Sequence, residues 1–241
     1  MIIKYDGVIH ISRWAVTSRC GNTVKKRFLF NNTPKIQKEV SLLRLSTQLD
    51  VKLYFDNETS NWVAEMPYLR LRPIFNGKNP CDTFEQLKRI FSAWESDPGY
   101  CALAPDDWEL VTKPYFMDLL TRYLPDPSGP AAYLSIQKAE HFIHGDFRLQ
   151  NVLRDEQGRI IVLDFENAMI GPRLWDEATL THNLIEDHQY GLAEKAFDTF
   201  CCPRMMLLTI AGIRLAQSRK KSLNDSGRME AYDFILNHFN R

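Results

Sequence analysis

Several features are scarce or missing in this 241-residue sequence, and each absence narrows what the protein can do. No CxxC pair occurs among the five scattered cysteines, which argues against a zinc clamp and is typical of reduced thiols in the cytoplasm. The most apolar run, MMLLTIAGI at 205–213, is too short to cross a bilayer, and the start MIIKYDGVIH lacks the apolar region of a signal peptide. We therefore expect a cytoplasmic protein without a membrane span.

Net charge is also absent, because 30 Lys and Arg residues balance 30 Asp and Glu residues. The charges are nevertheless unevenly distributed: residues 1–80 are basic, 81–172 are acidic and 173–241 are balanced. The basic first third is compatible with an anionic ligand or with ordinary solvated surface charge. The basic patch RLRPIFNGK at 70–78 lacks the surrounding charge density of a nucleic-acid or lipid surface, so no nucleic-acid partner is expected.

The first seventy residues have the pattern of strands around one helix. Residues 8–16 and 23–30 are rich in strand formers, and a turn containing Gly21 joins them as a hairpin. Apolar residues at helical spacing predict a helix over 35–46, and a second hairpin follows over 51–69. The expected order is strand, strand, helix, strand, strand.

The remainder is mainly helical, with one short β-rich insert. The segment 82–94 has Asp82 and Glu85 at capping-box spacing, and Pro114 is expected to end or kink the helix that precedes it. Further helices are predicted over 114–124, 131–140, 176–189, 192–200, 204–220 and 227–239. The insert ends in a nearly all-apolar strand that terminates at Asp164. The fold class is therefore α+β.

Three polar residues of this insert have the character of a reaction centre. The stretch HFIHGDFRLQNVL at 141–153 contains Asp146 and, five residues later, Asn151, and Asp164 follows the next strand. Phosphoryl transfer needs a carboxylate to orient and deprotonate the acceptor hydroxyl, and hard oxygen ligands for the magnesium that bridges the phosphates. Asp146 is the predicted base, and Asn151 and Asp164 are the predicted metal ligands.

These motifs resemble those of a known family. HGDFRLQN followed by IIVLDFE resembles the catalytic-loop and metal-loop pair of the aminoglycoside phosphotransferase and choline kinase-like superfamily, relatives of protein kinases in which H-G-D replaces H-R-D, and GPRLWDEA is similar to the segment that follows. The resemblance implies a bilobal protein kinase-like fold. It implies a nucleotide-binding lobe at 1–68, a catalytic and substrate-binding lobe at 69–241, and ATP, with GTP as an alternative, together with Mg²⁺.

A kinase-like small lobe also requires a lysine for the α and β phosphates and a glutamate that holds it. Strand alternation places Lys26 on one face with its apolar neighbours and Lys25 on the other. Glu39 is the acid of the following helix, so Lys26 and Glu39 are the expected pair. The segment WVAEMPYL matches the linker whose backbone would bond the adenine edge, with Met66 and Tyr68 as cofactor-binding residues.

Two departures from the protein-kinase pattern bear on the acceptor. There is no GxGxxG, and the metal loop has Glu166 where protein kinases have glycine. Only twelve positions separate Asp164 from Asp176, and they contain no A-P-E, which leaves no room for the long segment on which protein kinases bind peptides. The sequence therefore favours a small-molecule acceptor.

The resulting hypothesis is an ATP-dependent phosphotransferase that moves the γ-phosphoryl group to a hydroxyl of a small molecule such as a sugar, amino alcohol or aminoglycoside. The acidic middle third hints at a cationic acceptor. The alternatives are a protein kinase with a specific partner and a nucleotide-binding pseudokinase scaffold.

Three further residues of the motifs carry structural expectations. His144 is expected to brace the loop, and Asp176 is expected to hydrogen-bond the loop backbone. Arg148 stays open between steering an anion and pairing with a carboxylate.

Overall fold

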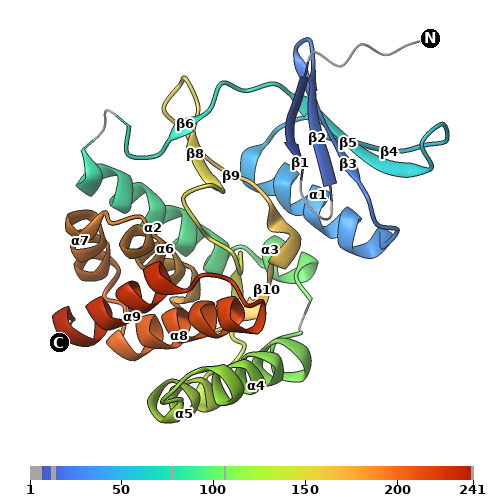
Figure 1. Cartoon of the computed structure of the whole chain (residues 1–241). Helices are drawn as coiled ribbons and strands as arrows, with labels where there is room; N and C mark the ends of the chain where they lie inside the picture. The colour runs from blue at the N-terminus through green and yellow to red at the C-terminus, as the bar shows by residue number, and fades with distance from the viewer. Residues whose placement is uncertain (1–6, 12–14, 77–78, 106, 240–241) are drawn as a thin grey trace. The chain divides into compact units, whose positions relative to one another are not determined.

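The computed structural model describes residues 7–11, 15–76, 79–105 and 107–239 (Figure 1). The chain divides into two compact units. One, the sheet unit, comprises Met1–Pro73 and Val152–Asn167, and the other, the helical unit, comprises Ile74–Asn151 and Ala168–Arg241. The sheet unit contains all of the lobe predicted over 1–68. It also contains residues 152–167, which the sequence assigned to the second lobe. The α+β class predicted from the sequence, with a β-rich N-terminal part and a mostly helical remainder, is confirmed.

The sheet unit is built on a five-stranded antiparallel sheet. Its strands are β1 (Gly7–Ile11), β2 (Ala15–Cys20), β3 (Thr23–Phe28), β4 (Lys52–Asp56) and β5 (Asn61–Pro67), in the order β1-β2-β3-β5-β4. The predicted turn between β2 and β3 is present, and Gly21 occupies it with φ +58°, a left-handed conformation that glycine adopts without strain. The strand predicted over 8–16 is divided between β1 and β2, and its residues 12–14 lie outside the described residues.

Helix α1 (Thr33–Thr47) is the single long helix of the described part of this unit. The Asn32 side chain caps it by accepting a hydrogen bond from the Lys35 N–H at 3.1 Å, and the helix ends at Gln48 in a left-handed conformation. Its buried face is apolar except for Thr47 and for Glu39, which is only 4% exposed. A charged group buried in this way requires a partner.

The discontinuous segment belongs to the sheet unit because it pairs and packs there. β6 (Arg72–Pro73), β8 (Val152–Arg154) and β9 (Ile160–Val162) form a second antiparallel sheet in that order. A 3₁₀ turn, η2 (Phe165–Asn167), follows β9 and packs against α1. Residues that are more than a hundred positions apart in sequence therefore meet on the inner face of α1.

The helical unit begins with α2 (Pro80–Ser96), which starts two residues earlier than predicted. Its cap is Asn79, whose side chain accepts a hydrogen bond from the Cys81 N–H at 3.1 Å, so the capping box predicted at Asp82 is wrong. The predicted apolar face is confirmed, and it is buried: Phe84, Leu87, Phe91 and Trp94.

Four of the remaining helices of this unit pack against one central helix, α8 (Arg204–Lys220). The other elements are α3 (Pro98–Leu103), the π-turn η1 (Trp108–Thr112), α4 (Lys113–Tyr123), α5 (Ser128–Ile136), β7 (His141–Ile143), β10 (Met169–Gly171), α6 (Trp175–Glu186), α7 (Tyr190–Phe200) and α9 (Ser226–His238). Helix α8, orange in Figure 1, packs against the green helices α4 and α5, against α6 and against the red helix α9. Within the described part of the chain, every helix is too short or too polar for a bilayer crossing.

Candidate active site

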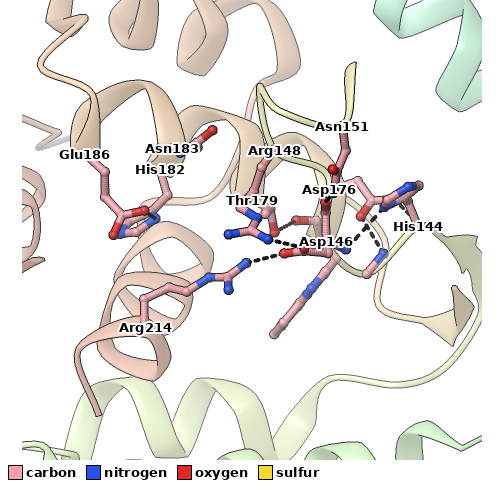
Figure 2. Close-up of polar contacts among 12 residues, drawn as sticks. His144, Asp146, Arg148, Asn151, Asp176, Thr179, His182, Asn183, Glu186 and Arg214 are labelled. Carbon is pink, nitrogen blue, oxygen red and sulfur yellow. Dashed lines mark hydrogen bonds and ion pairs between the residues drawn. The ribbon is translucent and has the colours of Figure 1, made fainter. Parts of the chain in front are cut away.

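The loop that follows β7 carries the predicted base, and Asp176 holds its backbone (Figure 2). The Asp176 carboxylate accepts hydrogen bonds from the His144 N–H at 2.6 Å and the Gly145 N–H at 3.0 Å, as the sequence analysis expected. Gly145 has φ +79°, which a side chain at this position would oppose. Burial raises the pKa of Asp176 to about 7, despite these two hydrogen bonds. The backbone turn of the H-G-D motif is thus held by a carboxylate at the start of α6.

His144 is a brace of this loop. It is fully buried, its Nδ1 accepts a hydrogen bond from the Asp146 N–H at 3.3 Å, and its ring stacks on Trp94 with centroids 6.4 Å apart. Packing is also close at Gly171 of β10, since a Cβ there would lie 2.3 Å from the Ile143 Cδ1 and would force that side chain to move. These contacts agree with a structural role for His144 and fix the direction in which the loop leaves β7.

Asp146 lies between two guanidinium groups (Figure 2). Its Oδ2 accepts a hydrogen bond from Arg148 Nη2 at 2.5 Å, and its Oδ1 accepts one from Arg214 Nη2 at 2.8 Å. Burial acts to raise the pKa of Asp146, but the Arg214 and Arg148 charges outweigh burial and hold this pKa below its usual value. The carboxylate is therefore ionised at neutral pH, as a proton acceptor must be.

Arg214 is a residue that the sequence analysis missed. It lies on α8, 68 positions from Asp146, and no local motif marks it. Arg148 lies on the catalytic loop itself, and its pairing with Asp146 is one of the two alternatives that the sequence left open. The Arg148 Nε is buried without a hydrogen-bond partner among the described residues.

Asn151 closes the same loop. Its Nδ2 donates a hydrogen bond to the Asp146 backbone carbonyl at 3.0 Å, which orients the amide and leaves its Oδ1 available as an oxygen ligand. The Leu149 N–H donates to the Asn183 side chain on α6 at 2.8 Å. These two hydrogen bonds hold the turn between Asp146 and Asn151 in place. The proposed role of Asn151 as a metal ligand stays a prediction.

In the sheet unit, Lys26 lies between two carboxylates. Its Nζ is 2.6 Å from Glu39 Oε1 and 2.8 Å from Asp164 Oδ1. Lys25 projects to the other face of β3 and pairs with Glu65 at 3.1 Å, so the predicted alternation and the predicted Lys26–Glu39 pair are both confirmed. Burial acts to lower the pKa of Lys26, but the Glu39 and Asp164 charges outweigh it and raise the pKa. Lys26 is therefore a fixed positive charge.

Asp164 follows β9 in a strained conformation and is surrounded by acids. Its φ of +67° is left-handed, a region that Asp tolerates better than most side chains, and the fully buried Phe165 anchors the next turn. Carboxylate oxygens of Glu39, Asp164 and Glu166 lie within 4.8 Å of one another. Hard carboxylate donors at this spacing fit a divalent cation such as Mg²⁺. Glu166 was noted in the sequence only as a replacement for glycine, and the structure adds it as a candidate ligand.

Met66 and Tyr68 lie at the end of β5, where the adenine contact is predicted. Met66 is opposite Val24 in the ladder between β5 and β3, and the Tyr68 N–H donates to the Asn22 carbonyl at 2.8 Å. The Arg19 guanidinium lies 3.8 Å from the centroid of the Tyr68 ring. Both side chains are half-buried. Their contact with a nucleotide stays a prediction.

Comparisons with solved structures agree on the fold. The thermostable mutant of aminoglycoside phosphotransferase APH(4)-Ia is 14% identical with a TM-score of 0.66, and the match covers 98% of this chain and 95% of that one. The choline/ethanolamine kinase family protein from Mesorhizobium loti is 12% identical with a TM-score of 0.64, and the match covers 99% of this chain and 90% of that one. Amicoumacin kinase hAmiN, in complex with AMP-PNP, Ca²⁺ and Ami, is 13% identical with a TM-score of 0.61, and the match covers 94% of this chain and 85% of that one.

A comparison with curated protein sequences found no match. The model of the phosphotransferase enzyme family matches residues 56–205, more than half of the chain and a range that includes Asp146, Asn151 and Asp164. This match and the kinase-like fold agree with the residues brought together in each unit. The chain therefore belongs to the phosphotransferase enzyme family.

Proposed function

We propose that this phosphotransferase uses ATP and Mg²⁺ to phosphorylate a hydroxyl group of a small molecule. The observation that carries the proposal is the position of Lys26 between Glu39 and Asp164, because it combines a fixed cation, its brace and a hard oxygen ligand in one cluster. A lysine braced by a glutamate and placed beside a metal-binding aspartate is the arrangement that phosphoryl transfer from a nucleotide requires. GTP remains an alternative donor.

In the sheet unit, each residue of this cluster has a role toward the nucleotide. Lys26 would bind the α and β phosphates, and Glu39 would keep the ammonium in place. Asp164 would hold the metal, with Glu166 as a further candidate ligand from the same turn. A bound magnesium ion would neutralise the charge that develops on the phosphates. Met66 and Tyr68 would line the adenine site.

In the helical unit, Asp146 is the proposed base. It would accept the proton of the acceptor hydroxyl, whose oxygen forms the new bond to the γ-phosphorus while the bond to the ADP oxygen breaks. The proton then resides on Asp146, and ADP is the leaving group. Asn151 would contribute its Oδ1 to the metal, since its Nδ2 is already used within the loop.

The short segment between Asp164 and Asp176 supports a small acceptor. It consists of η2, β10 and the start of α6 in the structure, and it contains no extended platform for a peptide. Structural neighbours include proteins named as choline, amicoumacin and spectinomycin kinases or phosphotransferases, which act on small molecules according to those names. We therefore favour a small-molecule acceptor over a protein substrate.

The test is magnesium-dependent ATP turnover in the presence of a panel of sugars, amino alcohols, hydroxy acids and aminoglycosides. The variant Asp146→Asn should lower kcat by about 100- to 10,000-fold, the range for loss of a general base, and should still bind nucleotide. Asp118→Asn is the matched control, because it removes an exposed carboxylate of α4 that pairs only with Arg122 among the described residues. Equal turnover in wild type and Asp146→Asn would contradict the proposal, as would nucleotide binding without any transfer.

A further inference from the structure

The charges around Asp146 do not balance. One carboxylate is paired with two guanidinium groups, Arg148 at 2.5 Å and Arg214 at 2.8 Å, so this group of three residues has a surplus positive charge. The Arg214 side chain is only 20% exposed, and a partly buried charge without full compensation is costly. The loop itself already supplies one guanidinium partner of Asp146, that of Arg148. The second arginine therefore needs another explanation.

Arg214 is held firmly on its helix. Its backbone carbonyl accepts a hydrogen bond from Arg228 Nη1 of α9 at 2.9 Å, and α8 is packed on several sides by other helices. Asp146 is the one hydrogen-bonding partner of the Arg214 guanidinium among the described residues. Since a guanidinium carries five N–H donors in a planar fork, most of the donors of Arg214 are free for a ligand.

The other charges near Arg214 do not cancel it. Glu186 of α6 pairs with Arg228 at 3.2 Å and lies 3.5 Å from His182 Nδ1. His182 itself is buried, and its burial together with the charges of Arg214 and Arg228 lowers its pKa to about 3, so it stays neutral. Among the described residues of the helical unit, Asp146 is the one carboxylate within ion-pair distance of the Arg214 guanidinium.

We propose that Arg214 is an acceptor-binding residue that holds an anionic group, a carboxylate or a phosphate, next to the hydroxyl that Asp146 deprotonates. The inference rests on the proposed function and names the class of its substrate. A guanidinium binds such groups through charge-assisted and often bidentate hydrogen bonds. The acidic composition of residues 81–172 hinted at a cationic acceptor, whereas the side chains that contact the predicted base are cationic.

The experiment measures kcat/KM for two acceptor series with matched skeletons: glycerol, glycerate, glycerol 3-phosphate and 3-amino-1,2-propanediol, then glucose, glucuronate, glucose 6-phosphate and glucosamine. Wild type should prefer an anionic member of a series by at least about tenfold. Arg214→Gln should lower kcat/KM for that member by about 10- to 100-fold more than for its neutral counterpart. Arg214→Lys should give an intermediate value, because it keeps the charge and loses the fork.

The matched control is Arg219→Gln, which removes the same charge from the same helix. Arg219 pairs with Asp225 at 2.8 Å and has no contact with Asp146, so its variant should keep the wild-type preference. Whether the carboxylate or the phosphate member is preferred identifies the source of the anionic group. In parallel, thermal melting should show stabilisation of wild type, but not of Arg214→Gln, by the preferred anionic compound.

Several results would overturn the inference. They are a preference for neutral or cationic acceptors, a loss in Arg214→Gln that is equal for all acceptors, a rise in the KM for ATP instead of the acceptor, or the absence of any stabilisation by the anionic compounds. Asp146-dependent transfer that prefers neutral or cationic acceptors would overturn the inference and leave the proposed function intact. Absence of transfer to every acceptor would count against the proposed function, and the melting data would then decide on Arg214 alone.

Discussion

In the sheet unit one ammonium group, that of Lys26, lies between the carboxylates of Glu39 and Asp164, whereas in the helical unit one carboxylate, that of Asp146, lies between the guanidinium groups of Arg148 and Arg214. Each unit thus encloses a central charge between two opposite charges. The surplus is negative around Lys26 and positive around Asp146. The first cluster suits a metal cation and the second suits an anion.

The two clusters have similar geometry but differ in how far the sequence predicts them. Lys26 and Glu39 follow from local rules, strand alternation and the single acid of the next helix, so each could be predicted. Asp146 and Asn151 follow from a motif. The partner of Asp146 on α8 follows from neither, because it depends on how distant helices pack.

Among the variants at positions other than Asp146, the largest effect is expected in the sheet unit, for Lys26→Met. Removal of the ammonium leaves the buried Glu39 without its partner and removes the contact to the phosphates, so kcat/KM for ATP should fall by about 100- to 1,000-fold. The control is Lys25→Met, because Lys25 is the adjacent residue of β3 and pairs with Glu65 on the other face. Steady-state kinetics with varied ATP measures both. Equal losses in the two variants would contradict the role of Lys26.

A smaller effect is expected in the helical unit, for Asp176→Ala. Loss of this carboxylate leaves the N–H groups of His144 and Gly145 without their acceptor, which should lower the free energy of unfolding by about 2 to 3 kcal/mol and loosen the loop before Asp146. Urea denaturation and kcat report the two consequences. Glu177→Gln is the control: burial raises the pKa of Glu177 to about 8, so glutamine resembles its neutral form. If Asp176→Ala is as stable and as active as Glu177→Gln, the loop keeps its conformation without the Asp176 hydrogen bonds.

Burial, together with the charges of Arg214 and Arg228, should also make the stability of the helical unit depend on pH through His182. Its pKa is about 3 in the folded protein and ordinarily about 6.5, so below pH 6.5 the unfolded chain binds a proton that the folded protein does not. Between pH 7.5 and 5, this one group should reduce the free energy of unfolding by about 2 kcal/mol.

The matched comparison for this effect is wild type against His182→Gln, measured by denaturation at both pH values. Asp176 and Glu177 have raised pKa values in the folded protein, so their contributions grow as the pH falls and have the opposite sign. They are common to both proteins and cancel in the difference. An identical pH dependence in the two proteins would show that His182 is not held neutral.

The smallest effect is expected for Glu166→Gln in the sheet unit. Glu166 belongs to the three carboxylates that lie within 4.8 Å of one another, and its loss should weaken magnesium binding in the presence of nucleotide by about tenfold. Titration of magnesium against ATP turnover measures this affinity. Glu58→Gln removes an exposed acid of the turn between β4 and β5 and serves as the control. Unchanged magnesium affinity would limit the metal ligands of this unit to Asp164.

Much of the fold and about half of the candidate site could be predicted from the sequence. Individual residues show why the rest could not. The helix face that begins at Phe84 and the pair Lys26–Glu39 were predictable because periodicity and alternation are local. The start of α2 was misplaced since Asn79, three positions before Asp82, provides an equally good cap.

The parts that could not be predicted depend on tertiary packing. Residues 152–167 join the sheet unit because β8 pairs with β6, a contact between segments about eighty positions apart. Arg214 meets Asp146 because α8 packs behind the catalytic loop, and an arginine within a helix has no signature that distinguishes it from a surface charge. Glu166 joins Asp164 and Glu39 through the turn η2, which has no strong pattern of its own.

We expect the two clusters to divide the work: the sheet unit would bind the metal-nucleotide, and Asp146 would act on the acceptor. Calorimetric titration of Mg-ATP into Asp164→Asn and Asp146→Asn tests this division most directly, with titrations of ATP in EDTA as reference. Asp164→Asn should lose the magnesium-dependent part of the affinity, and Asp146→Asn should bind Mg-ATP nearly as wild type does. Wild-type binding by both variants, or a loss confined to Asp146→Asn, would contradict it.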